Sequence, residues 1–197
     1  MSAKPVPRLN AAEYLEIERA ATYKSEFHDG ELFAMAGASR EHNGIKDNLI
    51  VEIGSRLRGG KCRTFSSDQR VKVDATGLYT YPDIVLLCGP GEYDPLDRDT
   101  LVNPTAIVEV LSPSTEAYDR GAKFRQFREV ASLQEYILVS QNEPVVERFA
   151  RQAEGTWSLT TYAGMDAVLE LTCAAVSIPF TEIYRDIEGF DESSSAS

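Results

Sequence analysis

The chain has 197 residues, of which 43% are hydrophobic and 26% charged, so it can form one globular domain with a sizeable core and does not resemble a disordered protein. No apolar run approaches the roughly 20 residues of a membrane helix, and the first ten residues lack the apolar segment of a secretory signal. The net charge of −11 is the reverse of the basic footprint that nucleic-acid-binding proteins usually carry. An acidic chain can still bind DNA where its lysines and arginines gather on one face, so the charge does not exclude this class.

The three cysteines, Cys62, Cys88 and Cys173, are scattered along the chain. Their number is odd, and no pair has the spacing of a metal-binding or redox motif. Such cysteines are typical of cytoplasmic proteins, so we expect three reduced thiols and a cytoplasmic location.

The first elements predicted are a helix, a hairpin and a longer helix. Asn10 can cap a helix that runs to about Tyr23. Asp29-Gly30, between two short apolar stretches, indicates the turn of a β-hairpin. A second helix begins after Ser39 and ends near Arg58. Its apolar stripe consists of His42, Ile45, Leu49, Ile53 and Leu57.

Most of the remaining chain predicts strands. The segments are Cys62–Ser66, Arg70–Asp74, Tyr81–Cys88, Ala106–Leu111, Glu135–Ser140, Val145–Ala150, Trp157–Tyr162 and Val168–Leu171. A third helix follows Ser112–Thr115 and runs to about Val130, and Pro179 opens a short last helix. This order predicts an α/β fold with a mixed central β-sheet flanked by helices. We expect one domain over residues 1–187 and a disordered acidic, serine-rich tail over residues 188–197.

Two carboxylates lie in otherwise apolar predicted strands. Asp83 opens the run Asp-Ile-Val-Leu-Leu, and Glu109 lies within Ala-Ile-Val-Glu-Val-Leu. A buried carboxylate is costly unless a cation, a donor or a metal compensates it. Two of them on neighbouring strands repel each other unless a positive charge lies between them. We therefore favour a Mg²⁺ site for the pair, whereas either carboxylate alone could equally cap a strand or pair with an arginine.

A lysine follows on the third predicted helix. At about 100° per residue, Lys123 shares one arc with Phe124, Phe127, Val130 and Ala131, so we expect it to face inward. From there it could reach the carboxylates, orient the attacking water and stabilise charge on a phosphoryl group.

Two neighbours on this helix bear on that hypothesis. Arg120 lies on the same arc and could contact phosphate. Asp119 offers the alternative, an (i, i+4) ion pair with Lys123 on a solvated face.

These residues belong to a longer pattern. Tyr81-Pro82-Asp83 is followed by Glu-Val-Leu-Ser-Pro-Ser-Thr from Glu109, and then by Asp119 and Lys123. The pattern resembles the Uma-type restriction endonucleases of bacteria, in the PD-(D/E)xK nuclease superfamily, over roughly residues 14–184. The resemblance implies a restriction-endonuclease-like fold. In our hypothesis Asp83 and Glu109 hold Mg²⁺, with the Val110 carbonyl as a further ligand.

One position departs from the superfamily pattern. The usual lysine, two residues after the glutamate, is replaced by Leu111. The resemblance implies that the lysine has moved to the following helix, which matches Lys123. If Lys123 does not reach the carboxylates, the site binds metal without cleaving.

Several further residues are candidates for the site. By analogy with the family His42 lines it, although a core histidine is the commoner explanation. Glu26 and Glu52 are candidate third carboxylates, because the superfamily often uses a glutamate from an early helix. Three tyrosines near the Asp83 strand could stack on bases or simply pack, namely Tyr79, Tyr81 and Tyr93.

The leading hypothesis is a cytoplasmic endonuclease that hydrolyses phosphodiester bonds in DNA with Mg²⁺, or with Mn²⁺ as a substitute. The alternative is a catalytically inactive nuclease fold that binds nucleic acid or protein, which the charge of −11 and Leu111 motivate. A third hypothesis is a homodimer whose late strands, residues 145–171, form the interface.

Overall fold

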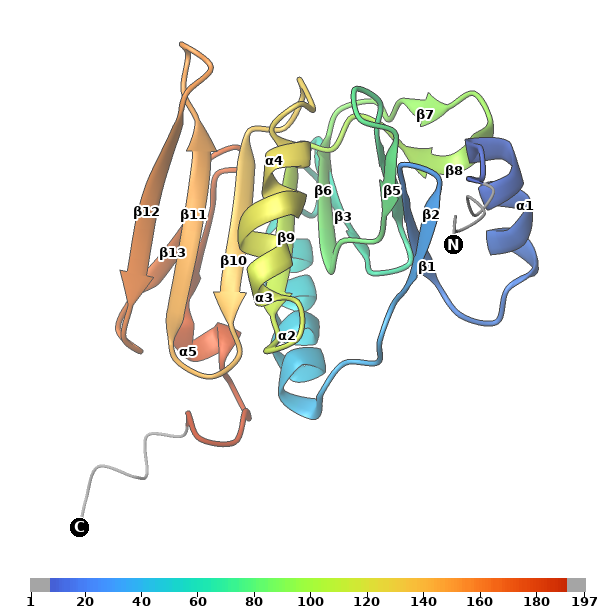
Figure 1. Cartoon of the computed structure of the whole chain (residues 1–197). Helices are drawn as coiled ribbons and strands as arrows, with labels where there is room; N and C mark the ends of the chain where they lie inside the picture. The colour runs from blue at the N-terminus through green and yellow to red at the C-terminus, as the bar shows by residue number, and fades with distance from the viewer. Residues whose placement is uncertain (1–7, 191–197) are drawn as a thin grey trace.

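Two six-stranded β-sheets and the helices packed against them form the protein (Figure 1). The computed structural model describes residues 8–190. The α/β class expected from the sequence is confirmed. Within the described range, no helix has the length and apolar character needed to cross a membrane.

The central sheet has the strand order β12-β11-β10-β9-β6-β3. Strands β9 (Ala106–Leu111) and β10 (Glu135–Ser140) run parallel, and all other neighbours run antiparallel, so the sheet is mixed as predicted. The remaining strands are β3 (Cys62–Ser66), β6 (Ile84–Cys88), β11 (Val145–Arg151) and β12 (Trp157–Ala163).

Helices cover both faces of the central sheet. One face packs against α2 (Arg40–Arg56), α5 (Phe180–Ile183) and the hairpin β13 (Val168–Leu171)–β14 (Val176–Pro179). The other face packs against the helical segment made of α3 (Glu116–Tyr118), the π-helical η1 (Asp119–Lys123) and α4 (Phe124–Phe127).

The register of β9 decides which way Glu109 points. Val108 and Val110 pack on the α2 face, and Ile107 and Leu111 on the α4 face. Because successive side chains of a strand point to opposite faces, Glu109 points with Leu111 toward η1 and α4.

A second sheet, in the order β2-β1-β5-β4-β8-β7, lies beside the first. Its strands are β1 (Ser25–His28), β2 (Glu31–Ala34), β4 (Arg70–Val73), β5 (Leu78–Thr80), β7 (Tyr93–Asp94) and β8 (Asp97–Leu101). Helix α1 (Ala11–Ala20) covers it, with Tyr14 packed on Phe27 and Tyr79. The predicted Asp29-Gly30 turn joins β1 to β2, and both residues have positive φ angles, 50° and 82°.

Two predicted helices end earlier than expected. Asn10 forms the capping box of α1, but the helix stops at Ala20 because the backbone of Ala21 is extended toward β1. The third helix ends at Phe127 rather than Val130.

The π-helical segment also changes which side chains of the third helix face inward. The wider turn of a π-helix rotates each residue by less than the 100° assumed for an α-helix. Asp119 is therefore buried together with Lys123, whereas Arg120, predicted on the inward arc, is exposed. Ala131, predicted on the same arc, is exposed because it lies beyond the end of the helix.

The expectation of three free thiols is wrong. Cys62 and Cys88 form a disulfide, and only Cys173 is free among the described cysteines. Cys62 and Cys88 are 26 residues apart in sequence but lie directly opposite each other in the antiparallel pair β3–β6. Sequence spacing does not reveal such a cross-strand pair, because it depends on the strand register.

The predicted tail lies partly outside the described residues. Within residues 188–190, the ring of Phe190 stacks on Tyr184 at 4.5 Å between centroids. Residues 191–197 lie outside the described range.

Candidate active site

Asp83 connects three elements at the start of β6. Its Oδ2 accepts a hydrogen bond of 2.8 Å from the backbone N–H of Val110 on β9. The Nε2 atom of His42 lies 3.1 Å from the same oxygen. His42 is held in the first turn of α2, where its N–H donates to the capping hydroxyl of Ser39. Asp83 thus joins β6 to β9 and to the helix on the far face of the sheet.

Glu109 lies next to Asp83 and is 3% exposed. Its Oε2 accepts a hydrogen bond of 3.2 Å from the backbone N–H of Asp83. Its Oε1 lies 2.8 Å from Nζ of Lys123. The structure therefore brings the two predicted carboxylates and the predicted lysine together.

Lys123 lies at the end of η1, with its amine among three carboxylates. Besides Glu109, the Nζ atom is 3.3 Å from Oε1 of Glu26 and 3.6 Å from Oδ1 of Asp119. The (i, i+4) pair with Asp119 is thus present, but both side chains are buried rather than solvated.

Glu26 reaches this group from the second sheet. Its Oε1 accepts a hydrogen bond from the Thr80 hydroxyl, and its Oε2 accepts one of 2.9 Å from the Tyr118 hydroxyl. The same side chain contacts Lys123, so Glu26 joins β1 to the α3–η1 segment. We call Lys123, the three carboxylates beside its amine (Glu26, Glu109 and Asp119) and the adjoining Asp83 the Lys123 cluster.

Burial and like charge shape the ionisation of this cluster. Burial, with Asp119 and Asp83 nearby, raises the pKa of Glu109 well above its ordinary value, although Lys123 opposes the shift. Burial also raises the pKa of Asp119. Burial alone would lower the pKa of Lys123, but Glu109, Glu26 and Asp119 outweigh it and raise that pKa well above the ordinary value. Lys123 is therefore held as a protonated cation, and the raised pKa values of Glu109 and Asp119 show that ionised carboxylates are costly beside it.

The structure does not bring Glu52 or Arg120 into the cluster. Both oxygens of Glu52 are engaged on α2, one by Arg56 and one by Arg185. Arg120 is exposed and pairs with Glu116 and Glu147.

Two of the tyrosines considered as base-stacking residues, Tyr79 and Tyr81, are buried, and Tyr93 is 43% exposed.

Sequence reasoning missed two members of the site. Asp119 belongs to the family pattern, but the sequence indicated no role for it beyond a surface partner of Lys123, because the π-helical turn that buries it leaves no signal in the sequence. Tyr118 had no signal at all, since its hydrogen bond to Glu26 depends on how the two sheets meet.

The oxygen atoms around Asp83 and Glu109 suit Mg²⁺. Because the N–H and C=O of a residue in an antiparallel pair point toward the same neighbouring strand, the Val110 carbonyl faces the Asp83 side as its N–H does. The buried Oε1 of Glu109 accepts no hydrogen bond of normal geometry from the described residues, although Lys123 is close. Mg²⁺ typically takes one or two carboxylates and completes its octahedron with water and phosphate oxygens, so this donor set fits it. Across residues 8–190, no group of three or more His, Cys, Asp or Glu side chains is arranged to hold a metal ion by itself.

Comparison with known proteins identifies close sequence relatives of the chain. A sequence model of the Uma2 family, described as "Putative restriction endonuclease", matches residues 11–180. An uncharacterized protein of Synechocystis sp. is 37% identical over 186 residues, which cover 93% of this chain and 95% of that protein. A second uncharacterized protein of that organism is 36% identical over 168 residues, which cover 83% of this chain and 93% of that protein.

A solved structure shares the fold. The crystal structure of a protein from Anabaena variabilis, described as a putative nuclease belonging to DUF820, superposes with a TM-score of 0.71. The match covers 87% of this chain and 95% of that chain at 17% sequence identity, so it speaks for the fold alone.

Proposed function

The chain belongs to the Uma2 family, as its sequence pattern predicted, and from this premise we propose that it is a Mg²⁺-dependent endonuclease that hydrolyses phosphodiester bonds in DNA. The name of the family supports nuclease chemistry in general. The metal, the DNA substrate and the residue roles are our proposal, and they rest on the Lys123 cluster.

The excess of negative charge in the Lys123 cluster carries the proposal. Three carboxylates lie beside the amine of Lys123 and a fourth, Asp83, adjoins Glu109; four of these five side chains are buried. Two unit charges about 4 Å apart interact by roughly 4 kcal/mol at an effective dielectric constant of about 20. One lysine cannot offset repulsion of this size among four carboxylates. A divalent cation between Asp83 and Glu109 supplies the missing positive charge.

Asp83, Glu109 and the Val110 carbonyl would hold this cation. Bound Mg²⁺ supplies Lewis-acid stabilisation of the phosphate and lowers the pKa of a water molecule, and Mn²⁺ can replace it. His42 would keep the Asp83 carboxylate in place, because its Nε2 lies 3.1 Å from Oδ2.

Lys123 would act as a fixed cation rather than as a base. Its pKa is raised well above the ordinary value, so the amine stays protonated at neutral pH. A protonated amine can donate a hydrogen bond to the attacking water and stabilise negative charge on the phosphoryl group. Glu26 and Asp119 hold it in that position through contacts of 3.3 and 3.6 Å.

A plasmid-nicking assay with Mg²⁺ or Mn²⁺ tests these roles. We expect Asp83→Ala, Glu109→Gln and Lys123→Met each to lower the rate by about 100- to 1,000-fold, the usual cost of removing one electrostatic group from an active site. Glu52→Gln is the matched control, because this carboxylate pairs with Arg56 and Arg185 instead. Equal rates in wild type, Asp83→Ala and Lys123→Met would refute the assignment.

A nuclease fold that binds without cleaving is the second candidate. The position that carries the usual superfamily lysine is Leu111, which is 4% exposed and packed in the core beside Phe124. Calorimetric titration with Mg²⁺ and Mn²⁺ separates the two functions. The endonuclease requires metal binding that Asp83→Ala abolishes, whereas no heat at millimolar metal favours the binding module.

A further inference from the structure

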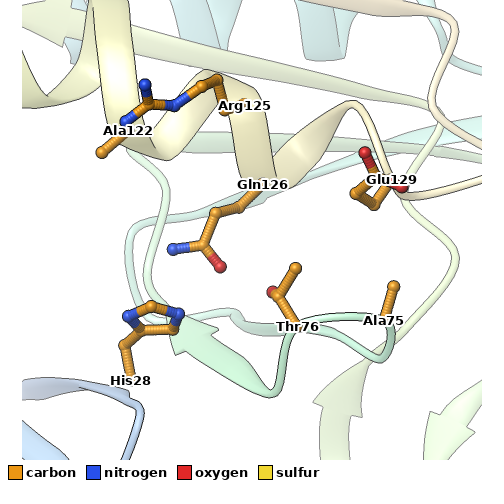
Figure 2. A pocket seen from close by; sticks show the side chains of 7 residues that line it. All are labelled: His28, Ala75, Thr76, Ala122, Arg125, Gln126 and Glu129. Carbon is orange, nitrogen blue, oxygen red and sulfur yellow. The ribbon is translucent and has the colours of Figure 1, made fainter.

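An open cleft lies between the second sheet and α4. Its volume is about 550 Å³, and it is lined by His28 of β1, Ala75 and Thr76 of the β4–β5 turn, Ala122 of η1, and Arg125, Gln126 and Glu129 (Figure 2). None of these residues belongs to the Lys123 cluster.

The cleft lies along the same two elements that hold Glu26 and Lys123. Gln126 follows Lys123 by three residues, which places it on the adjoining part of the same helix face, about 4.5 Å further along the axis. His28 follows Glu26 by two residues, on the same face of β1 and about 6.6 Å away. Stacked nucleotides advance by about 3.4 Å each along a strand, so a strand bound at the proposed catalytic lysine can place a neighbouring base in the cleft.

The side chains in the cleft match a nucleobase. Imidazole rings are surfaces on which unpaired bases stack, and His28 supplies one across the cleft from the helix, whereas the Arg125 guanidinium lies along the helix beside Ala122. A carboxamide presents a donor and an acceptor together, as the edge of a base does. Figure 2 shows the Gln126 amide extending from the helix toward Thr76 and His28.

One atom in the cleft has no partner. The Oε1 of Gln126 is buried, and no described residue donates a hydrogen bond to it. An unpaired buried carbonyl is costly, and rotation of the side chain would let it accept from an amino or imino group of a base.

We propose that this cleft binds the base of an unpaired nucleotide next to the cleavage position, with Gln126 bonded to the base edge and His28 against its face. The inference rests on the proposed function, because it places the strand by reference to Lys123. The base enters the cleft only when it is unpaired, so the substrate contains a single-stranded or extruded nucleotide at that position.

Binding without metal tests the cleft separately from cleavage. A fluorescently labelled 12-nucleotide DNA strand is titrated with the full chain in EDTA, and anisotropy gives the Kd. We expect Gln126→Ala and His28→Ala to weaken binding by about 10-fold each, the cost of one lost stacking or edge contact. Gln134→Ala and Arg128→Ala are the matched controls, since both residues are exposed and lie outside the cleft. Thermal unfolding of each variant confirms that it is folded.

Abasic strands make the test specific for a base. Removing one base at the bound position should weaken binding to wild type by about 10-fold or more and should weaken binding to Gln126→Ala by less, because that variant has already lost the edge contact. Independent, additive losses overturn the proposal, as does the absence of binding by wild type. A free nucleoside monophosphate that competes as well as the strand also overturns it, because the cleft would then take free nucleotides.

The two proposals fail in different ways. If the protein nicks DNA with Mg²⁺ but Gln126→Ala binds the strand as tightly as wild type, the endonuclease proposal stands and the nucleobase proposal is wrong. If binding depends on Gln126 but no DNA is nicked, the cleft binds a base as proposed and the protein is a binding module rather than an endonuclease.

Discussion

Two regions of this protein bury charged side chains, and they balance the charges differently. On the second sheet, Arg70 donates hydrogen bonds to Thr100, Tyr81 and Asp97, and Arg19 lies 3.2 Å from Asp97. The Tyr81 hydroxyl in turn donates to Glu18. We call this group the Arg70 network. Its two carboxylates, Asp97 and Glu18, are matched by two arginines.

The pKa values of the carboxylates differ between the Arg70 network and the Lys123 cluster, according to how many cations lie nearby. Burial on its own would raise the pKa of Asp97, but hydrogen bonds from Thr100 and Arg70 outweigh it and lower that pKa below the ordinary value. In the Lys123 cluster, burial and neighbouring carboxylates raise the pKa values of Glu109 and Asp119. A balanced network is what a structural role requires, whereas an unsatisfied cluster at the junction of three elements is suited to binding a cation.

Breaking the Arg70 network should have the largest effect on stability. Arg70→Met leaves Asp97 buried with only Arg19 as a cation, so we expect a loss of about 3–5 kcal/mol in the free energy of unfolding. Urea unfolding followed by circular dichroism measures it. Arg98→Met is the control, because that side chain is 94% exposed and should change stability by less than about 0.5 kcal/mol. Similar midpoints for Arg70→Met and wild type would show that the network has no structural role.

The Lys123 cluster should instead respond to metal. We expect Mg²⁺ at about 100 times its Kd to raise the free energy of unfolding by about 2.7 kcal/mol, because it binds only the folded chain. Asp83→Asn should abolish this increment, and Asp97→Asn should keep it. Thermal unfolding with and without EDTA measures both. The same increment in the two variants would place the metal outside the Lys123 cluster.

The sequence indicated the parts of the site that lie on long elements. Asp83 and Glu109 could be predicted because an acidic residue in a continuous apolar strand is conspicuous, and Lys123 because aromatic residues follow it at helical spacing. Glu26 could not be distinguished from Glu52, since both are glutamates near apolar residues. Only the packing of the second sheet against η1 brings Glu26, and not Glu52, to the lysine.

The second sheet itself was hard to predict for a related reason. Strands β5 and β7 have three and two residues, too few for the alternation of polar and apolar residues to be recognised. The Cys62–Cys88 pair likewise depends on the register of two strands, which spacing along the chain does not contain.

The stability of the protein at acidic pH should distinguish the Arg70 network from the Lys123 cluster. Asp97 has a lowered pKa in the folded state, so its contribution is complete above its unfolded pKa of about 3.9 and is lost as the pH falls through the lower folded value. We expect Asp97→Asn to be less stable than wild type by about 1.5–3 kcal/mol, the value of hydrogen bonds to a charged group, at every pH from 7 to about 4. Below that pH the two proteins should converge. Asp99→Asn, with its side chain 81% exposed, should match wild type throughout. If the stability difference between Asp97→Asn and wild type instead grows as the pH falls, the pKa of Asp97 is raised rather than lowered in the folded state, and the interpretation is wrong.

Replacing Glu109 should stabilise the protein rather than destabilise it, and this change in the free energy of unfolding should be the smallest of those predicted. Its folded pKa is raised, so ionisation of Glu109 costs stability as the pH rises from its unfolded pKa of about 4.3 through the folded value. Glu109→Gln keeps the shape of the protonated side chain, and in EDTA at pH 8 we expect it to be more stable than wild type by about 1 kcal/mol. The gain should disappear below about pH 4, where Glu109 is protonated in both states.

A second buried glutamate provides the matched control for the expected stabilisation by Glu109→Gln. Glu135 is 1% exposed on β10, but it accepts hydrogen bonds from Thr172 and lies 3.4 Å from Arg148. Its charge is compensated, so Glu135→Gln should destabilise the protein under the same conditions. Urea unfolding of the two variants in EDTA at pH 8 decides between the explanations. If both variants are destabilised, Lys123 already neutralises Glu109, and the excess charge that calls for a metal ion does not exist.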